Sequence, residues 1–494
     1  MEILAFVEEL IQGGLGNLAA YLAAHVLLCL VPAFFIAGAM TALIPKESVT
    51  RFLGRNRPKF ISYPAAALAG SVLAVCSCTV VPLFAGIYKK GAGLGPAITF
   101  LFFAPAANIL ALVYTGGVIG VDLALARLFL SLAFGIGIGM IMALIFRRED
   151  AAHDQATDTL FAGQNARGMR PAALAFLLIL VALLLAGTLK IGILTSSYIQ
   201  AGVPVPGVSN FQWQLDRLVP YDEARGQEGV SVQGLALIVL LAGIGLAAWK
   251  GFENIHDGFN RWTWVALGLI SLTLLVASLG VQVEAAGLSI AVTGKSLGVL
   301  AALAALFWIG VKYLTESEIR DFLWESWRFV KQIFPLLVAG VFMVGVIRVI
   351  IQPEWIEALA GENTLLGNLA GVIFGVLMYF PTLVEVPIAQ MFLSLGMHRG
   401  PLLAYLMSDP ELSLQSILIT AAIIGKLKAW VYVGWVALFS TLAGLLYGSW
   451  VDGTSLGLLV FYLALFLGAL ALVLWIVSHR NQVKAAEKVL VTSD

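Results

Sequence analysis

The sequence predicts an all-α protein that crosses a membrane many times. Of its 494 residues, 60% are hydrophobic and only 12% are charged, whereas soluble domains have roughly 45–50% and about 25%. The apolar residues gather in long stretches, and a helix needs about 20 of them to cross a bilayer. The formal net charge is zero, so no nucleic-acid partner is expected. These observations exclude a soluble enzyme and indicate that lipid is the natural solvent.

Eleven apolar stretches are long enough to be full spans, and two further stretches are interrupted by proline and polar residues. The interrupted stretches, 62–88 and 367–395, are expected to form re-entrant or broken hairpins. Strands are not expected, because no long alternating pattern occurs. The full spans are predicted at 16–44, 94–115, 118–146, 171–191, 232–249, 262–280, 297–311 (a short one), 327–351, 401–425, 428–449 and 455–477.

An internal repeat relates two parts of the chain at a displacement of 305 residues, as from Gly70 to Gly375. With only 17 prolines in 494 residues, a chance agreement of three prolines in one register is improbable, although coincidence between Gly/Pro-rich helices is the alternative. Further pairs in this register are Gly91 and Gly396, Gly95 and Gly400, Pro82 and Pro387, Pro96 and Pro401, and Pro105 and Pro410. Such self-similarity predicts a repeated architecture.

The repeat predicts four regions. Repeat A occupies 1–148 and repeat B occupies 311–450. Residues 149–310 form middle transmembrane helices with a cytoplasmic linker and an external loop. Residues 451–494 form the last transmembrane helix and a cytoplasmic tail.

Basic residues predict that the two repeats are inverted relative to each other. Lys and Arg collect in cytoplasmic loops, and five of them lie between Lys46 and Lys59 after the first span. The matching loop, 354–362, contains three glutamates and no Lys or Arg. Corresponding loops on opposite sides indicate an inverted-topology repeat. The same rule places 89–90, 147–148, 426–428 and the tail in the cytoplasm, and 398–399 outside.

Interruptions of the helices recur at matching positions of the two repeats. One pair lies at 76–79 and 380–382, and the other lies around Pro105 and Pro410. Backbone groups freed at membrane depth are tolerated where they are buried in protein or line a cavity, and matching breaks point to a transporter site. Simple proline kinks are the alternative. Polar and proline residues at these breaks are the predicted substrate-binding residues: Ser77, Thr79, Pro105, Asn108 and Thr382.

Cysteines at one break predict a thiol site. Cys76 and Cys78 are two residues apart on a predicted non-helical break in the interrupted stretch, where both side chains can turn toward one point. Thiolates bind soft ions such as Cu(I), and trivalent arsenic is likewise thiophilic. We therefore expect these two cysteines to hold a soft metal or arsenical, with Cys29 as an optional third donor. The alternative is that all three are small buried hydrophobic residues.

Three acidic residues lie in the apolar segments of repeat B. They are Glu385, Asp409 and Glu411. An ionisable group at the centre of a membrane helix costs at least about 2.5–3.5 kcal/mol, so such groups are usually functional. We expect these acids to couple transport to protons or another cation. For Asp409 the alternative is a helix N-cap followed by proline, which is a common way to begin a helix.

One stretch resembles a known family. Residues 75–96, VCSCTVVPLFAGIYKKGAGLGP, are similar to the signature of the predicted-permease family, which includes ArsP organoarsenical effluxers and YraQ-type permeases. Residues 104–108 and 385–387 are similar as well, and the resemblance covers roughly 16–146 and 312–450. It implies a multi-pass permease of the bacterial inner membrane, and for some members efflux of trivalent arsenicals through cysteine thiols.

Three functions remain open at this point. The first is a secondary permease that exports a thiophilic trivalent arsenical or soft metal species. The second is a permease for another small solute, with structural cysteines. The third is a membrane thiol-redox enzyme, and the spacing of Cys76 and Cys78 counts against it because redox pairs usually have the Cys-x-x-Cys spacing. No enzyme activity and no cofactor are expected. The expected partners are a small-molecule or metalloid substrate, the lipid bilayer and, in a homo-oligomer, further copies of the chain.

Overall fold

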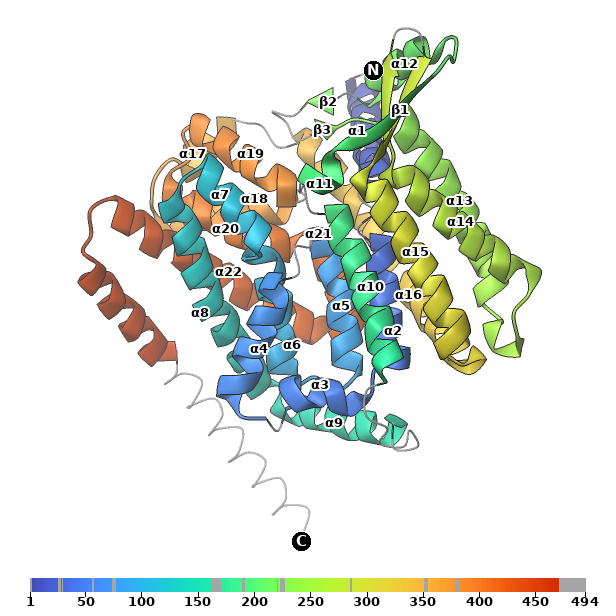
Figure 1. Ribbon diagram of the computed structural model, residues 1–494. Helices are drawn as coiled ribbons and strands as arrows, with labels where there is room; N and C mark the ends of the chain where they lie inside the picture. The colour runs from blue at the N-terminus through green and yellow to red at the C-terminus, as the bar shows by residue number, and fades with distance from the viewer. Residues whose placement is uncertain are drawn as a thin grey trace.

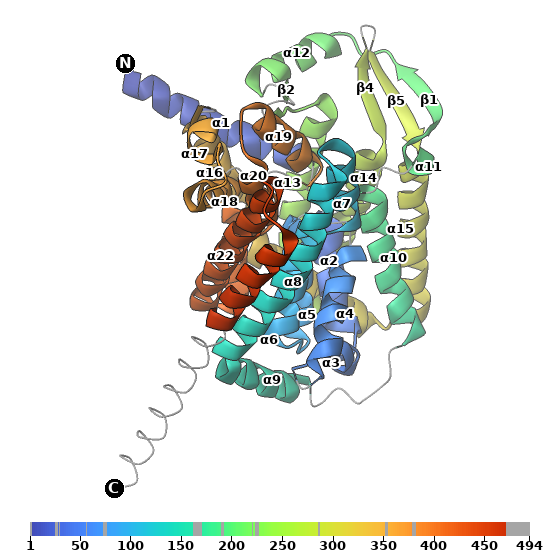
Figure 2. The same cartoon turned by 90° about the vertical axis from the view of Figure 1, so that its left-hand side faces the viewer.

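In the computed structural model the chain folds as a bundle of helices that lie side by side (Figure 1, Figure 2). The described residues are 2–24, 28, 30–55, 57–72, 77–161, 170–188, 192–219, 221–222, 227–284, 287–350, 354–377 and 382–470. Within them, seven helical stretches are long and apolar enough to cross a membrane: Leu94–Val118, Val121–Ile145, Val232–Phe252, Arg261–Ser278, Gly294–Tyr313, Glu316–Ile347 and Lys426–Val451. The architecture agrees with the predicted helical membrane protein, and the total of eleven spans stays a prediction.

The first half of the chain forms eight helices before the polar helix α9 (Arg147–Phe161). The interrupted stretch at 62–88 becomes two helices on either side of residues 73–76, which lie outside the described part. The eight helices are α1 (Glu2–Ala24), α2 (Val31–Leu43), α3 (Lys46–Leu53), α4 (Lys59–Val72), α5 (Ser77–Lys89), α6 (Leu94–Ala106), α7 (Ile109–Val118) and α8 (Val121–Ile145).

The helices of the second half follow the same order. They are α16 (Glu316–Ile350), α17 (Glu354–Ala360), α18 (Leu365–Leu377), α19 (Thr382–Ser394), α20 (Arg399–Leu412), α21 (Leu414–Ile424) and α22 (Lys426–Val451). The displacement of 305 residues from Gly70 to Gly375 also brings both ends of α5 onto those of α19, and the start of α8 onto that of α22. Gly91 and Gly396 have φ of 87° and 91° in the matching turns, a conformation that favours glycine.

Contacts between α8 and α22 show that these matched helices run antiparallel. Near the start of α22, Lys428 Nζ lies 2.8 Å from the Oε2 of Glu149, which follows the end of α8. Near the end of α22, the Tyr447 hydroxyl donates to Asp122 Oδ2 at the start of α8, at 2.8 Å. A helix pair whose opposite ends meet in this way is antiparallel. The inversion of the complete repeats remains a prediction.

The predicted cytoplasmic and external loops lie at opposite ends of α8. At the end that we call the α9 end, Asp150 accepts a hydrogen bond from the Leu94 N–H at 2.9 Å and lies 3.5 Å from Arg55 Nε. Burial raises the pKa of Asp150, and these two contacts partly oppose the rise. At the other end, the α17 end, Arg399 Nη1 lies 2.9 Å from Asp122 Oδ2. Figure 1 shows α3 and α9 at the lower end and α17 at the upper end.

The middle region packs beside α1, α2 and α16 as four long helices (right-hand side of Figure 1). They are α10 (Pro171–Thr188), α13 (Val232–Phe252), α14 (Arg261–Ser278) and α15 (Gly294–Tyr313). Helix α15 is 20 residues long, so the span predicted at 297–311 was too short. A capping box between Thr293 and Ser296 begins the helix earlier, and such a box satisfies backbone N–H groups at a helix start.

Strands occur outside the long helices, so the prediction of no strands was wrong. A three-stranded antiparallel sheet has the order β1 (Ser197–Val203), β5 (Gly287–Thr293), β4 (Gly280–Glu284), and lies near α12 (Val208–Leu218) in Figure 2. Two-residue strands β2 (Tyr221–Asp222) and β3 (Gln227–Glu228) form a second pair. A long alternation of apolar and polar residues is the mark of a membrane β-barrel. These strands are short and belong to connecting segments, so they lack that pattern. Other short elements are α11 (Gly192–Thr195) and η3 (Ile255–Asp257).

The centre of the bundle is formed by α6 and α20. All 13 residues of α6 are buried, and so is every residue of α20 from Gly400 to Leu412. A helix that is buried on all sides has no polar face to show, which fits the apolar sequence of α6. In α20 the buried residues include Ser408, Asp409 and Glu411. Of the two central helices, α20 therefore brings polar groups of the second half to the middle of the protein.

Candidate functional site

Two helix breaks lie at matching positions, after α6 and after α20. In the first half, Asn108 caps α7: its Oδ1 accepts a hydrogen bond from the Ala111 N–H at 2.8 Å, and its Nδ2 donates to the Pro105 carbonyl at 3.3 Å. In the second half, Ser413 caps α21, and its Oγ accepts from the Ser416 N–H at 3.3 Å. The same displacement of 305 residues relates these two caps. Each cap satisfies a backbone donor that the new helix leaves unpaired.

The breaks come after the prolines that predicted them. Pro105 lies inside α6 and Pro410 lies inside α20. Each helix continues past its proline and ends where a capping residue begins the next helix. Asp409 also lies inside α20, so the alternative reading of Asp409 as an N-cap was wrong. The caps at this depth are Asn108 and Ser413. Of the two, only Asn108 is among the site residues predicted from the sequence.

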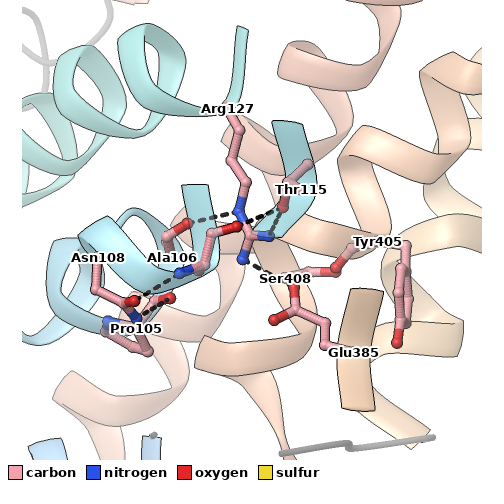
Figure 3. Close-up of polar contacts among 9 residues, drawn as sticks. Pro105, Ala106, Asn108, Thr115, Arg127, Glu385, Tyr405 and Ser408 are labelled. Carbon is pink, nitrogen blue, oxygen red and sulfur yellow. Dashed lines mark hydrogen bonds and ion pairs between the residues drawn. The ribbon is translucent and has the colours of Figure 1, made fainter. Parts of the chain in front are cut away.

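A fully buried arginine occupies the first break. Arg127, on α8, donates from Nε to the Ala106 carbonyl at 2.6 Å and from Nη1 to Thr115 Oγ1 at 3.1 Å. Its Nη2 donates to Oε1 of Glu385 at 2.8 Å. The arginine and glutamate side chains are 0% and 1% exposed. Figure 3 shows that Arg127 reaches from α8 between the end of α6 and α19.

The Arg127–Glu385 ion pair joins the two halves of the chain. Arg127 and its two other partners belong to the first half, whereas Glu385 lies on α19 of the second half. Only one carboxylate oxygen meets the guanidinium. The other, Oε2, is buried and has no hydrogen-bond partner among the described residues. Tyr405 and Ser408 of α20 lie on the same side of the arginine as Glu385 (Figure 3).

A second buried acid lies at the matching break of the second half. The Tyr432 hydroxyl of α22 donates to Glu411 Oε2 at 2.8 Å, and Glu411 Oε1 has no partner in the described part of the chain. Tyr432 and Glu411 occupy the positions that correspond to Arg127 and Ala106 in the first half. Both partners here belong to the second half. The two breaks therefore have the same framework and different chemistry.

Much of the predicted thiol site lies outside the described residues. This applies to Cys29 and Cys76, and to the side chains of Ser77, Cys78 and Thr382. The backbone of Cys78 is in the first turn of α5, so the expectation that both cysteines lie on a non-helical segment was wrong for Cys78. Thr79 is described and fully buried. Three His, Cys, Asp or Glu side chains that could hold a metal ion do not come together in the described part, and the thiol site stays a prediction.

Comparison with known proteins shows what the chain is similar to. The sequence model of a family described as predicted permeases matches residues 13–449. The chain belongs to the predicted permease family. UPF0718 protein MJ0584 of Methanocaldococcus jannaschii is 31% identical over 448 residues, which cover 91% of this chain and 98% of that protein. UPF0718 protein YraQ of Escherichia coli K12 is 29% identical over 118 residues, 24% of this chain and 34% of that protein. No solved structure matches.

Membership agrees with the resemblance found in the sequence and supports a transporter rather than an enzyme. The match extends across the middle region as well as both halves, because it runs from residue 13 to 449. Together with its apolar helices, this makes the permease a multi-pass membrane protein. The substrate does not follow from the family description.

Arg127 is a site residue of the permease that the sequence did not predict. Basic residues served only to predict the orientation of loops, and this arginine lies inside the predicted span 118–146. A signal was available, because an arginine inside a membrane helix is costly and needs a partner. The identity of that partner was not available, since Glu385 is 258 residues away in the sequence.

The permease also has an apolar groove of about 530 Å³ between α2, α13, α14 and α16. None of the predicted site residues lines this groove. At its edge, Lys331 Nζ donates to both carboxylate oxygens of Glu253 at 2.8 Å. These bonds from Lys331, with one from Trp327 Nε1, lower the pKa of Glu253. The groove is therefore separate from the polar site at the breaks.

Proposed function

We propose that this protein is a secondary permease of the inner membrane that exports a thiophilic trivalent arsenical or a soft metal species. The observation that carries the transport part is the buried Arg127–Glu385 pair, which links the two halves beside a helix break. Charged groups inside a membrane protein are costly and mark substrate or ion pathways. The thiophilic cargo is supported by the Cys76 and Cys78 pair in the family-like sequence.

An inverted-topology repeat is part of this proposal. Its support is the antiparallel arrangement of the matched helices α8 and α22. Further support comes from α6 and α20: α6 begins at the α9 end beside Asp150, and α20 begins at the α17 end beside Asp122. In transporters with inverted repeats, one repeat moves against the other around a site between them.

The cysteines supply the cargo chemistry in this proposal. Two thiols can hold one arsenic centre that keeps a carbon bond, and Cys29 can act as a third donor for arsenic without one. Each thiol that binds exchanges with a hydroxyl on arsenic and releases water. Exchange between thiols at a soft centre also allows release, so binding does not trap the cargo.

Everted membrane vesicles test the proposal, because export by the cell becomes uptake by the vesicle. Vesicles that contain the protein should take up a trivalent monomethyl arsenical faster than vesicles without it. Cys76→Ser and Cys78→Ser should each abolish this uptake, and Cys29→Ser should weaken it less. Serine is nearly isosteric, so the amount of protein in the membrane should remain normal.

One observation favours the second candidate, a permease for another small solute. Cys78 lies in a helical turn of α5, where cysteine often acts as a small buried residue. Wild-type uptake by the double variant Cys76→Ser, Cys78→Ser would exclude transport through thiols. A permease with structural cysteines would then be the better description.

A further inference from the structure

We infer that Arg127 and Glu385 form the coupling centre of the permease, with Glu385 as the proton carrier and Arg127 as the residue that keeps it ionised in the state seen here. The inference rests on the proposed secondary transport and names its coupling ion. It also separates Glu385 from Glu411, to which we assign a structural role.

The first step is the position of the pair. Arg127 belongs to the first half through α8, and its contacts to Ala106 and Thr115 keep it there. Glu385 belongs to the second half through α19. Any movement of one half against the other must change this contact. Such interfaces have discrete arrangements rather than a continuous range.

The second step concerns charge. Arginine stays protonated in proteins, and a buried charge that loses its partner is strongly destabilising. Glu385 therefore carries the negative charge in this structure. Its Oε2 is buried and has no donor among the described residues. A proton can add to Oε2 without displacing the hydrogen bond from Arg127 to Oε1.

The third step links the proton to movement. A proton from one side of the membrane converts the Glu385 carboxylate to a neutral acid and removes its attraction to Arg127. Arg127 then retains two partners, both in its own half. Glu385 is free to move with α19 and to release the proton on the other side. When Arg127 and Glu385 are in contact, the positive charge disfavours a proton on Glu385, and when they are apart Glu385 accepts one. Protonation therefore shifts the population toward the state in which the pair is separated.

Other charged groups near α19 do not replace Arg127. The helix packs against α7 and α20, and among the described contacts of Glu385 the only cation is Arg127. The ionisable residues on the surrounding helices α7, α8 and α20 are Tyr114, Asp122, Arg127, Arg399, Tyr405, Asp409 and Glu411. Of these, Arg399 is engaged with Asp122 at the α17 end.

Glu411 differs from Glu385 in two respects. Its described partner is the Tyr432 hydroxyl, which carries no positive charge. A buried carboxylate without a counter-charge is more stable as the neutral acid. Both α20 and α22 belong to the second half, so this hydrogen bond persists when the halves move. Glu411 is thus a matched control for Glu385: the same side chain, likewise buried, in a contact within one half.

Infrared difference spectra of the purified protein in liposomes, recorded over a pH series, test the inference without any cargo. We expect a carboxylic-acid band that appears as pH falls, is absent in Glu385→Gln and persists in Glu411→Gln. In Arg127→Gln no such pH-dependent band should appear, because without the positive charge the acid is protonated throughout the series. A pH-dependent band that survives in Glu385→Gln, or one that is unaltered in Arg127→Gln, would overturn the assignment.

Transport provides the second arm, with the trivalent monomethyl arsenical as the probe. Glu385→Gln should lose proton-driven accumulation at least tenfold and retain counterflow exchange, whereas Glu411→Gln should accumulate as wild type does. Arg127→Lys should retain more proton-driven accumulation than Arg127→Gln, because lysine keeps the positive charge. If a single variant misfolds, Arg127→Gln with Glu385→Gln removes both charges together, and it should fold and exchange without proton dependence. Absent counterflow in wild type would contradict the arsenical cargo alone, whereas proton-driven accumulation by Glu385→Gln would contradict the coupling role.

Discussion

The two helix breaks have the same framework, and they differ in what the neighbouring long helix brings to them. At the first break, α8 brings Arg127, which binds a backbone carbonyl and reaches across to Glu385 of the other half. At the second, α22 brings Tyr432 to the matching position, and it binds Glu411 of its own half. A repeated backbone can therefore place different chemistry at equivalent sites. One break connects the halves, and the other strengthens a single half.

The ends of α8 provide a second comparison with the buried pair. Asp122–Arg399 also joins the two halves at one end, and Glu149–Lys428 joins the start of α9 to α22 at the other. These pairs are partly exposed, whereas the Arg127–Glu385 side chains are 0% and 1% exposed. Exposed ion pairs contribute about 0–1 kcal/mol, and removal of one partner of a buried pair costs about 3–5 kcal/mol. The central pair should therefore dominate the energetics of the contact between halves.

The largest expected effect is the loss of one partner of the central pair. Arg127→Met should destabilise the protein by about 3–5 kcal/mol, because it leaves a buried carboxylate without its counter-charge. The double variant Arg127→Met, Glu385→Met should recover most of this loss. Thermal unfolding of the purified protein in one detergent measures both. A loss in the double variant equal to the sum of the Arg127→Met and Glu385→Met losses would mean that the pair is not energetically coupled.

The next effect concerns the second break. Tyr432→Phe removes the donor to Glu411 and should cost about 1–3 kcal/mol, since a buried acceptor loses its partner. Tyr447→Phe is the matched control, because its hydroxyl donates to the half-buried Asp122. It should cost less. The pH profile of transport should stay as in wild type in Tyr432→Phe, and an altered profile would contradict a purely structural Glu411.

The caps of the two halves should show a smaller effect. Asn108→Ala and Ser413→Ala should each lower the stability by about 0.5–2 kcal/mol, because each leaves a backbone donor at the start of a helix unpaired. Asn108→Ala should be the more costly, because Asn108 also donates to the Pro105 carbonyl. Thermal unfolding would show the difference, and a neutral result at either position would indicate that another group caps that helix.

The smallest energetic effect belongs to surface positions that test the orientation of the halves. Arg57 and Glu362 are both exposed, so a cysteine at either site should barely change stability. In a variant with Cys29, Cys76 and Cys78 replaced by serine, a membrane-impermeant thiol reagent should label Arg57→Cys from the cytoplasmic side and Glu362→Cys from outside. Lys90 is unsuitable because its side chain is buried. Labelling of both from one side would rule out the inverted repeat.

Several features of the permease could be predicted from the sequence because they depend on local composition and spacing. Hydropathy identified helices such as Val121–Ile145, since the length of an apolar run reflects the thickness of a bilayer. The register from Gly91 to Gly396 was visible because both turns require positive φ. Glu385 and Glu411 were singled out because carboxylates are rare in such surroundings.

Other features were decided by the tertiary structure alone. The exact break positions at Asn108 and Ser413 depend on side-chain hydrogen bonds to nearby backbone groups, and the strands depend on pairing between segments as distant as Ser197 and Thr293. The partner of Glu385 depends on how α8 and α19 meet, across 258 residues of sequence. A sequence records that a charge is present in an apolar helix. Only the packing of the two halves decides which opposite charge stabilises it.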